Sequence, residues 1–400
     1  MAHQTRRAAC GNGAALFARM EGCEKDAGER RPAAHAALRA HAEGGVPTSG
    51  SGSPSADAAL RVHAGEDGSL ACGVVAVEQS WEAAWRDGAE LVVTGASRHA
   101  CNVALAGRLS GRGADLPCTY HPAAEATYLW IGARSCGFGP GGLVLDRDRL
   151  PKELARADRL VLRMACGRGV SFAVGAGCDA VEMRVGADAA RFSASLRMLP
   201  PVRADVSAAQ KAARRAEEVI RRQGSADSPF HPAFLPASGA DARMRAALVG
   251  RGSELCDRLL RGPSDGEGAP RALQALLGLG PGSTPSGDDF AVGALAAFLA
   301  VSGKPGAGCP QAVSAALQGA CGKTTFASRP YLLAASRGRF SNDVVFGVSA
   351  LLTGEGRGEG GACSSIARLL SHGATSGTDL LAGAAAMLRA FGEAEAAPKR

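Results

Sequence analysis

Two different hydrophobic patterns divide the chain. Between about residue 60 and residue 199, short apolar runs rich in β-branched residues alternate with glycine-rich turns, which is typical of β-strands. Few helical stretches separate these runs, so we expect a mostly antiparallel sheet or a small barrel. The predicted strands are Gly73–Val77, Leu91–Val93, Thr127–Ile131, Gly142–Leu145, Arg159–Leu162 and Ala180–Val185.

After Pro200 and Pro201 the apolar residues recur every three to four positions, which is helical spacing. The predicted helices are Val206–Gln223, Ala242–Leu260, Ala272–Leu279, Phe290–Val301, Gln311–Gly319, Tyr331–Ala335, Asn342–Leu352, Ile366–Leu370 and Leu380–Leu388. The sequence therefore predicts an α+β fold, with a β-rich N-terminal half followed by an all-α C-terminal half.

The same patterns predict three segments. Residues 1–58 are a low-complexity, poorly ordered extension with room for one short helix around Arg30–Ala42, and they end in the composition of a linker. Residues 59–200 form the β-rich domain, and residues 201–395 form the helical domain.

Composition excludes several classes of function. The net charge of +7 is modest for 400 residues and aromatic residues make up only 4%, which argues against nucleic-acid binding. No apolar run is long enough to cross a membrane. The twelve cysteines are scattered singly, without zinc-ligand spacing or a signal peptide, so we expect reduced thiols and a cytoplasmic location.

A short motif occurs twice in the helical half. Thr284–Ala294 and Ala374–Ala384 align without gaps, and each joins a polar turn to an apolar helix. Five pairs of residues are identical: Ser286 and Ser376, Gly287 and Gly377, Asp289 and Asp379, Gly293 and Gly383, Ala294 and Ala384. The repeat predicts two related helix starts, and helix N-termini commonly bind anions.

Two interpretations fit the repeat. Each Ser-x-x-Asp unit fits a capping box, in which the two side chains satisfy the first amides of a helix. However, both helices are apolar on all sides and should be buried, so their acidic starts need partners. We therefore favour a ligand site in which the two N-termini converge on one pocket and bind a phosphate or carboxylate group.

The candidate residues follow from this hypothesis. Asp288, Asp289, Asp379 and the adjacent His372 are the catalytic candidates, with His372 as a general base or anion donor. We expect no cofactor, although the carboxylates leave open a divalent cation such as Mg²⁺. The substrate-binding candidates are Thr284, Ser286, Gly287, Lys323, Thr324, Thr325, Ser328, Arg329, Ser376 and Gly377. The Gly322–Thr325 stretch lacks the first glycine of a P-loop, so it is included only as a source of cationic and hydroxyl donors.

The segment Leu276–Phe290 resembles the signature of a bacterial family, long described as a domain of unknown function, that includes the third, small subunit of oxamate carbamoyltransferase. The resemblance continues through Thr324–Ser328, Tyr331–Ala335, Gly338–Ser341 and His372–Asp379, and covers about residues 270–392. It is weaker in the β-rich half, at Phe138–Leu143 and Ala100–Asn102, and it is absent before about residue 70. Ser283 departs from the family pattern, and a stretch with His and Ser expected near Thr94–Asn102 matches poorly.

The resemblance implies a subunit of a hetero-oligomeric carbamoyltransferase complex in allantoin and purine nitrogen catabolism. Such a complex moves a carbamoyl group between oxalurate and phosphate, giving oxamate and carbamoyl phosphate. Anionic substrates and other subunits are then the expected partners. Two alternatives stay open: a non-catalytic assembly subunit, and an independent enzyme acting on another phosphorylated or carboxylated metabolite.

Overall fold

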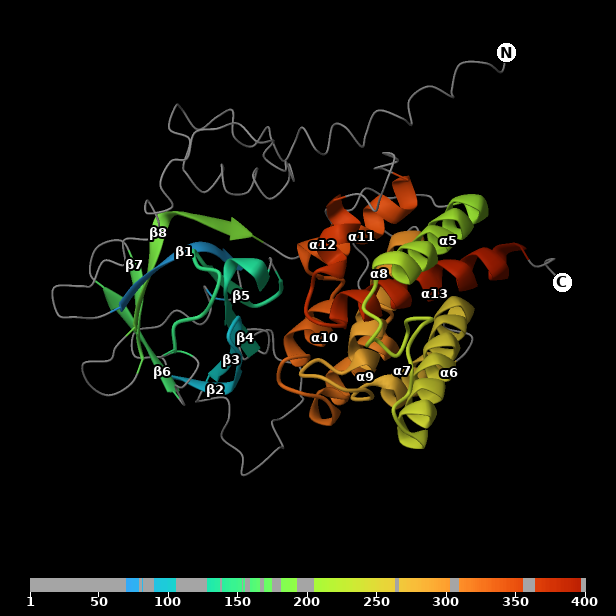
Figure 1. Cartoon of the computed structure of the whole chain (residues 1–400), viewed down its shortest axis with the longest axis horizontal. Coiled ribbons are helices and arrows are strands. Elements are labelled where there is room, and N and C mark those ends of the chain that lie inside the picture. Colours follow the sequence, from blue (N-terminus) through green and yellow to red (C-terminus); the bar gives the residue numbers. More distant parts are fainter. Residues whose placement is uncertain are drawn as a thin grey trace, which may run out of the picture.

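The computed structural model confirms the α+β fold, with a β-rich part followed along the chain by a helical part (Figure 1). It describes residues 70–78, 81, 90–105, 128–136, 139–152, 154, 159–165, 169–174, 181–192, 205–262, 266–302, 309–354 and 364–396. The expected N-terminal extension and its short helix lie outside these residues.

The β-rich part is one mixed sheet of eight strands. Its strands are β1 (Leu70–Glu78), β2 (Glu90–Ala96), β3 (Ala100–Leu105), β4 (Tyr128–Gly132), β5 (Gly142–Leu145), β6 (Arg159–Ala165), β7 (Gly169–Val174) and β8 (Val181–Phe192). They lie in the order β7-β6-β2-β3-β4-β5-β1-β8. Among the described strands, five pairings are antiparallel and two, β4 with β5 and β1 with β8, are parallel. The end strands β7 and β8 contact each other, so the sheet curls towards a barrel.

Each predicted strand overlaps an observed strand, but β3 and β7 were not predicted. Strand β3 reads Ala-Cys-Asn-Val-Ala-Leu, and only one of its residues is β-branched, so its local preference for a strand is weak. Pairing with β2 on one side and β4 on the other holds it in the sheet. The sheet core includes the buried side chains of Leu91, Ile131 and Leu143.

The helical part contains nine α-helices among the described residues. They are α5 (Val206–Gln223), α6 (Gly239–Arg261), α7 (Gly268–Leu276), α8 (Ser286–Val301), α9 (Gln311–Gly319), α10 (Arg329–Ala335), α11 (Asn342–Thr353), α12 (Ser364–Leu370) and α13 (Ser376–Ala396). Helix α7 ends three residues earlier than predicted, because Leu277 is extended and Gly278 has a φ of 79°. None of the described helices combines the length and apolar character that a bilayer crossing requires.

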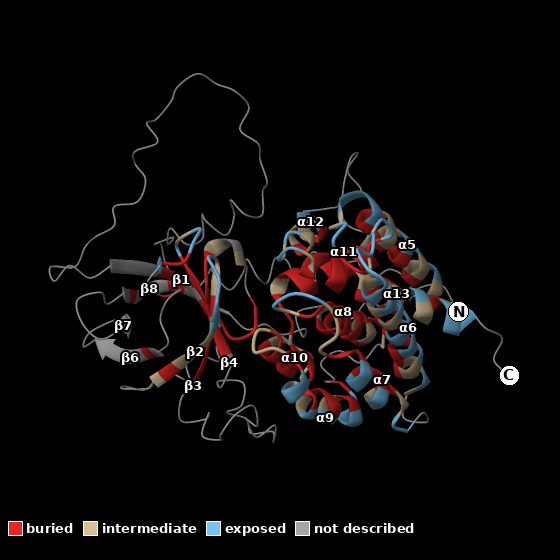
Figure 2. Ribbon diagram, turned by 60° about the horizontal axis from the view of Figure 1, so that its bottom comes forward, coloured by how far each residue is buried: buried red, intermediate tan, exposed pale blue. Residues whose placement is uncertain are grey.

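Helices α8 and α13, which begin at the repeated motif, lie together at the centre of the helical part (Figure 2). Both are largely buried, as their apolar sequences predict. The two helices pack reciprocally: a Cβ on Gly293 would overlap the backbone of Leu380, and a Cβ on Gly383 would overlap the backbone of Phe290. Phe290 and Leu380 are equivalent positions of the repeat, so the duplicated sequence forms a duplicated, two-fold-like contact.

Candidate functional site at the paired helix starts

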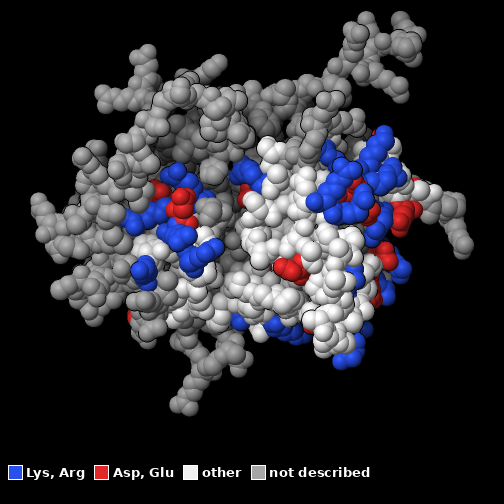
Figure 3. All heavy atoms as spheres, in the orientation of Figure 1, with Lys and Arg blue, Asp and Glu red and all other residues white. Residues whose placement is uncertain are grey.

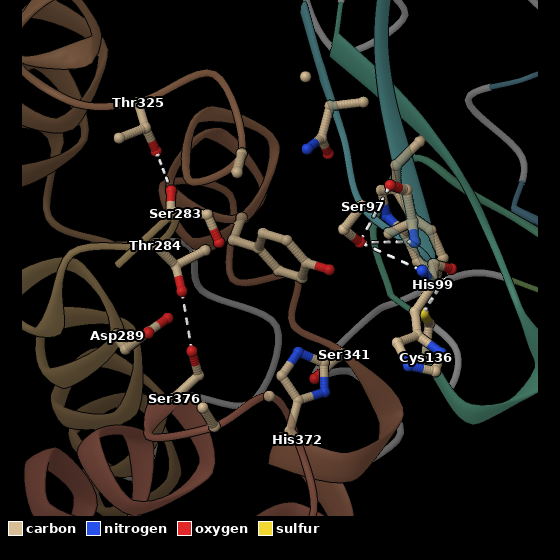
Figure 4. A pocket seen from close by; sticks show the side chains of 18 of the residues that line it. Ser97, His99, Cys136, Ser283, Thr284, Asp289, Thr325, Ser341, His372 and Ser376 are labelled. Atoms are coloured by element: carbon tan, nitrogen blue, oxygen red, sulfur yellow. Dashed lines mark hydrogen bonds between the residues drawn. The ribbon is translucent and has the colours of Figure 1, made fainter. Parts of the chain in front are cut away.

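A cavity of about 960 Å³ lies between the β-rich part and the helical part. One wall comes from β2, β3 and their connecting turn, and the facing wall comes from the loops that lead into α8 and α13 and from the start of α10 (Figure 4). Its polar lining residues are Thr94, Ser97, Arg98, His99, Asn102, Cys136, Ser283, Thr284, Asp289, Thr325, Tyr331, Ser341, Ser371, His372 and Ser376.

The two repeated helix starts meet on the helical wall. The hydroxyls of Thr284, just before α8, and Ser376, the first residue of α13, are 2.8 Å apart and hydrogen-bonded. Thr325 joins the same wall by donating a hydrogen bond of 2.5 Å to the carbonyl oxygen of Ser283 (Figure 4). Hydroxyl groups from three separate segments therefore face one cavity.

Asp289 is the acidic residue of this wall. Its Oδ2 atom is buried, and among the described residues it has no hydrogen-bond partner. Burial raises the pKa of Asp289 well above its usual range. The hydroxyls of Ser376 and Thr284 lower this pKa, whereas the charges of Asp379 and Asp288 raise it. Asp289 therefore keeps its proton to a higher pH than an ordinary aspartate, and it can donate as well as accept a hydrogen bond.

The other two candidate carboxyls lie behind the cavity wall. Asp288 is buried, accepts a 2.7 Å hydrogen bond from the Gly278 amide and accepts another from the Thr324 hydroxyl. Asp379 is fully buried and accepts a hydrogen bond from the Ser228 hydroxyl. Burial raises the pKa of Asp379 to about 6, against the opposing effect of hydroxyls that include those of Ser228 and Ser286. Both carboxyls tie loops to helix starts.

Ser286, Gly287 and Gly377 are buried and do not line the cavity. The Gly287 amide donates to the carbonyl oxygen of Leu279, and the Gly377 amide donates to that of His372, each at 2.8 Å. These amides are therefore bound by the loops that precede their own helices. The capping box is not formed in α8, because the N-cap is Pro285 and no side chain caps the helix.

Of the candidate residues in the basic stretch between the repeats, only one lines the cavity. Thr325 lines the cavity, whereas Lys323 is exposed outside it and Ser328 is buried beside Asp288. Arg329 is only 4% exposed. Its guanidinium carbon lies 4.1 Å from the ring centroid of Phe326. It also donates to the Thr324 carbonyl oxygen, so it helps to hold this loop in place.

His372 lines the cavity, and its ring lies edge-on to Tyr331 with the ring centroids 6.4 Å apart. Burial lowers the pKa of His372, and the charge of Asp343 acts in the opposite direction. A lowered pKa keeps the imidazole neutral at pH 7, which is the form that can accept a proton.

The sequence reasoning did not select the β-side residues of the site. Ser97, Arg98 and His99 form the turn between β2 and β3, and Asn102 follows in β3. The local signals are weak: a polar triplet between two apolar runs, which also fits an ordinary exposed turn, and the faint family resemblance at Ala100–Asn102. The sequence predicted no site role for Tyr331, which belongs to the family-like stretch Tyr331–Ala335, although it too lines the cavity.

Metal ligands and thiol nucleophiles are two further kinds of reactive group that the described residues could supply. No group of three or more His, Cys, Asp or Glu side chains among them could hold a metal ion, so the arrangement gives no support for the Mg²⁺ alternative. Cys136, the thiol that lines the cavity, has a pKa raised by burial. A thiol in this state is a poor nucleophile at neutral pH.

The helical region that forms one wall of this site can be matched to a known family. No curated protein and no solved structure matches the chain. Residues 276–388, from the end of α7 into α13, match the model of the family described as oxamate carbamoyltransferase subunit AllH. This range contains both repeated helix starts and the helical wall of the cavity. Over residues 276–388 the chain is therefore similar to the family of oxamate carbamoyltransferase subunit AllH, and this match supports membership in that family and a role as a subunit of an oxamate carbamoyltransferase complex.

Proposed function

We propose that this subunit binds the oxamate group of its substrate, either as oxamate or as oxalurate, on the helical wall of the cavity. The observation that carries the proposal is the convergence of Thr284, Asp289 and Ser376 from the two repeated helix starts on one 960 Å³ cavity. A cavity of this size is within the range of small-molecule sites.

The chemistry of the wall fits such a ligand. Oxamate carries a carboxylate next to a carboxamide, so it needs hydrogen-bond donors at one end and an acceptor at the other. The Thr284 and Ser376 hydroxyls supply donors, and the unpartnered Oδ2 atom of Asp289 supplies an acceptor when ionised or a donor when protonated. The neutral His372 beside them provides a group that can exchange a proton with the ligand.

The proposal is tested by isothermal titration of oxamate into the full chain, alone and within the reconstituted complex. Thr284→Val and Ser376→Ala each remove one hydroxyl from the wall, and we expect each to weaken oxamate binding about tenfold, the usual cost of losing a hydrogen bond to a charged ligand. Thr353→Val, at the exposed end of α11, is the matched control and should bind as the wild type does.

A non-catalytic assembly role is the competing function. It is favoured by the reciprocal packing of Gly293 and Gly383, which gives part of the repeat a purely structural use. If oxamate does not bind to the wild-type complex, or if neither wall variant weakens its binding, the assembly role is the better explanation.

A further inference from the structure

The two walls of the cavity differ in charge. Among the described residues that line it, Arg98 is the only lysine or arginine, and it lies on the β side. The helical wall instead carries the Asp289 carboxyl and a set of hydroxyls. On the face shown in Figure 3, lysine and arginine side chains gather both over the β-rich part and at the far side of the helical part, and the helical surface that faces the β-rich part is largely uncharged. A doubly charged anion is therefore favoured on the β side.

Arg98 is held in a way that leaves its binding atoms available. Its Nε donates a 2.7 Å hydrogen bond to Nε2 of His99, and Nδ1 of His99 lies 3.2 Å from the carbonyl oxygen of Asp148. Because Nε2 accepts a hydrogen bond, Nδ1 carries the ring hydrogen and donates a hydrogen bond to the carbonyl oxygen of Asp148. The Arg98 carbonyl oxygen accepts from the Leu150 amide at 2.9 Å, which fixes the backbone.

The two terminal nitrogens of the Arg98 guanidinium remain available to bind a ligand. None of the described residues bonds them, and the side chain is exposed at the cavity. Two parallel N–H groups of a guanidinium match two oxygens of a phosphate, which a lysine ammonium cannot do. The 960 Å³ volume also exceeds what a single molecule as small as oxamate fills.

We propose that the cavity holds both reactants at once, with phosphate, or the phosphoryl group of carbamoyl phosphate, on Arg98 and the oxamate group on the facing helical wall. This inference rests on the proposed function for its oxamate half. Placing the two anions on opposite walls separates their like charges and leaves the carbamoyl group between them.

The arrangement fits a direct transfer between the two sites. A phosphate oxygen attacks the carbamoyl carbon of oxalurate, so a C–O bond forms while the C–N bond to the oxamate nitrogen breaks. The proton of hydrogen phosphate passes to that nitrogen, which gives carbamoyl phosphate and oxamate with atoms and charge balanced. The transfer therefore consumes no co-reactant beyond these two.

The test is a pair of titrations on the full chain, one with inorganic phosphate and one with oxamate at saturating phosphate. Arg98→Gln should weaken phosphate binding about tenfold or more and leave oxamate binding unchanged. Thr284→Val should have the opposite effect. Arg149→Gln removes an exposed positive charge from the same part of the molecule but outside the cavity, so it should alter neither affinity.

Several results would overturn the inference. Equal weakening of phosphate binding by Arg98→Gln and Arg149→Gln would mean that phosphate responds only to the overall positive surface. Competition between phosphate and oxamate would mean that they share one site. If oxamate fails to bind, the proposed function fails, whereas the phosphate titration still decides the role of Arg98.

Discussion

Asp379 offers a direct measurement of the energetic cost of the buried helix start. It is fully buried, and burial raises its pKa from an ordinary value of 3.8 to about 6. A carboxyl whose pKa is higher in the folded protein binds more protons there than in the unfolded chain between these two values. The free energy of unfolding therefore falls as the pH rises from about 4 through 6, and it levels off above that pH.

The rise of this pKa from 3.8 to about 6 corresponds to ~3 kcal/mol of stability that is present below pH 4 and lost above pH 7. Asp379→Asn removes the titration while its side-chain oxygen can still accept from Ser228. The amide nitrogen would take the place of the unpartnered Oδ2 atom, at a cost that does not depend on pH. The titration of Asp379 is therefore measured by how the difference in free energy of unfolding between variant and wild type changes with pH.

Urea unfolding of both proteins, followed by circular dichroism at a series of pH values between 4 and 8, supplies this quantity. Relative to wild type, the variant should gain ~2 to 3 kcal/mol between the ends of the series. The charge of Asp379 also raises the pKa of Asp289, so its removal adds a change of the same sign. A difference that stays constant from pH 4 to pH 8 would refute the reasoning.

Two further predictions concern packing and thiol reactivity. Gly293→Ala and Gly383→Ala each force a methyl group into the backbone of the partner helix. Each should lower the free energy of unfolding by ~1 to 3 kcal/mol in the same urea assay. Gly319→Ala is the control, because it lies at the end of α9 and no atom lies near its added methyl group. Equal effects at all three positions would contradict the packing shown here. Burial raises the pKa of Cys101, Cys256 and Cys309 to about 12, so at pH 7.5 these thiols should resist iodoacetamide in the native protein and react after unfolding, as mass spectrometry can show.

The sequence alone determined the order of the elements and their type. Short β-branched runs and helical spacing are local properties, so they identified strands such as Gly142–Leu145 and helices such as Val206–Gln223 correctly. The repeat also identified the two helix starts as related segments, because the two motifs share identical residues at equivalent positions. The family resemblance over the helical half was readable for the same reason, and the family match confirms it.

Tertiary structure decided which side chains face the cavity. Asp288 and Asp289 are neighbours in a polar turn, yet one ties down Gly278 and the other lines the cavity, because successive helical residues point about 100° apart. The opposite wall, with Arg98, comes from a strand turn nearly two hundred residues earlier in the chain. No local sequence pattern predicts that this turn lies opposite the helix starts, because that depends on how the curled sheet packs against the N-terminal ends of α8 and α13.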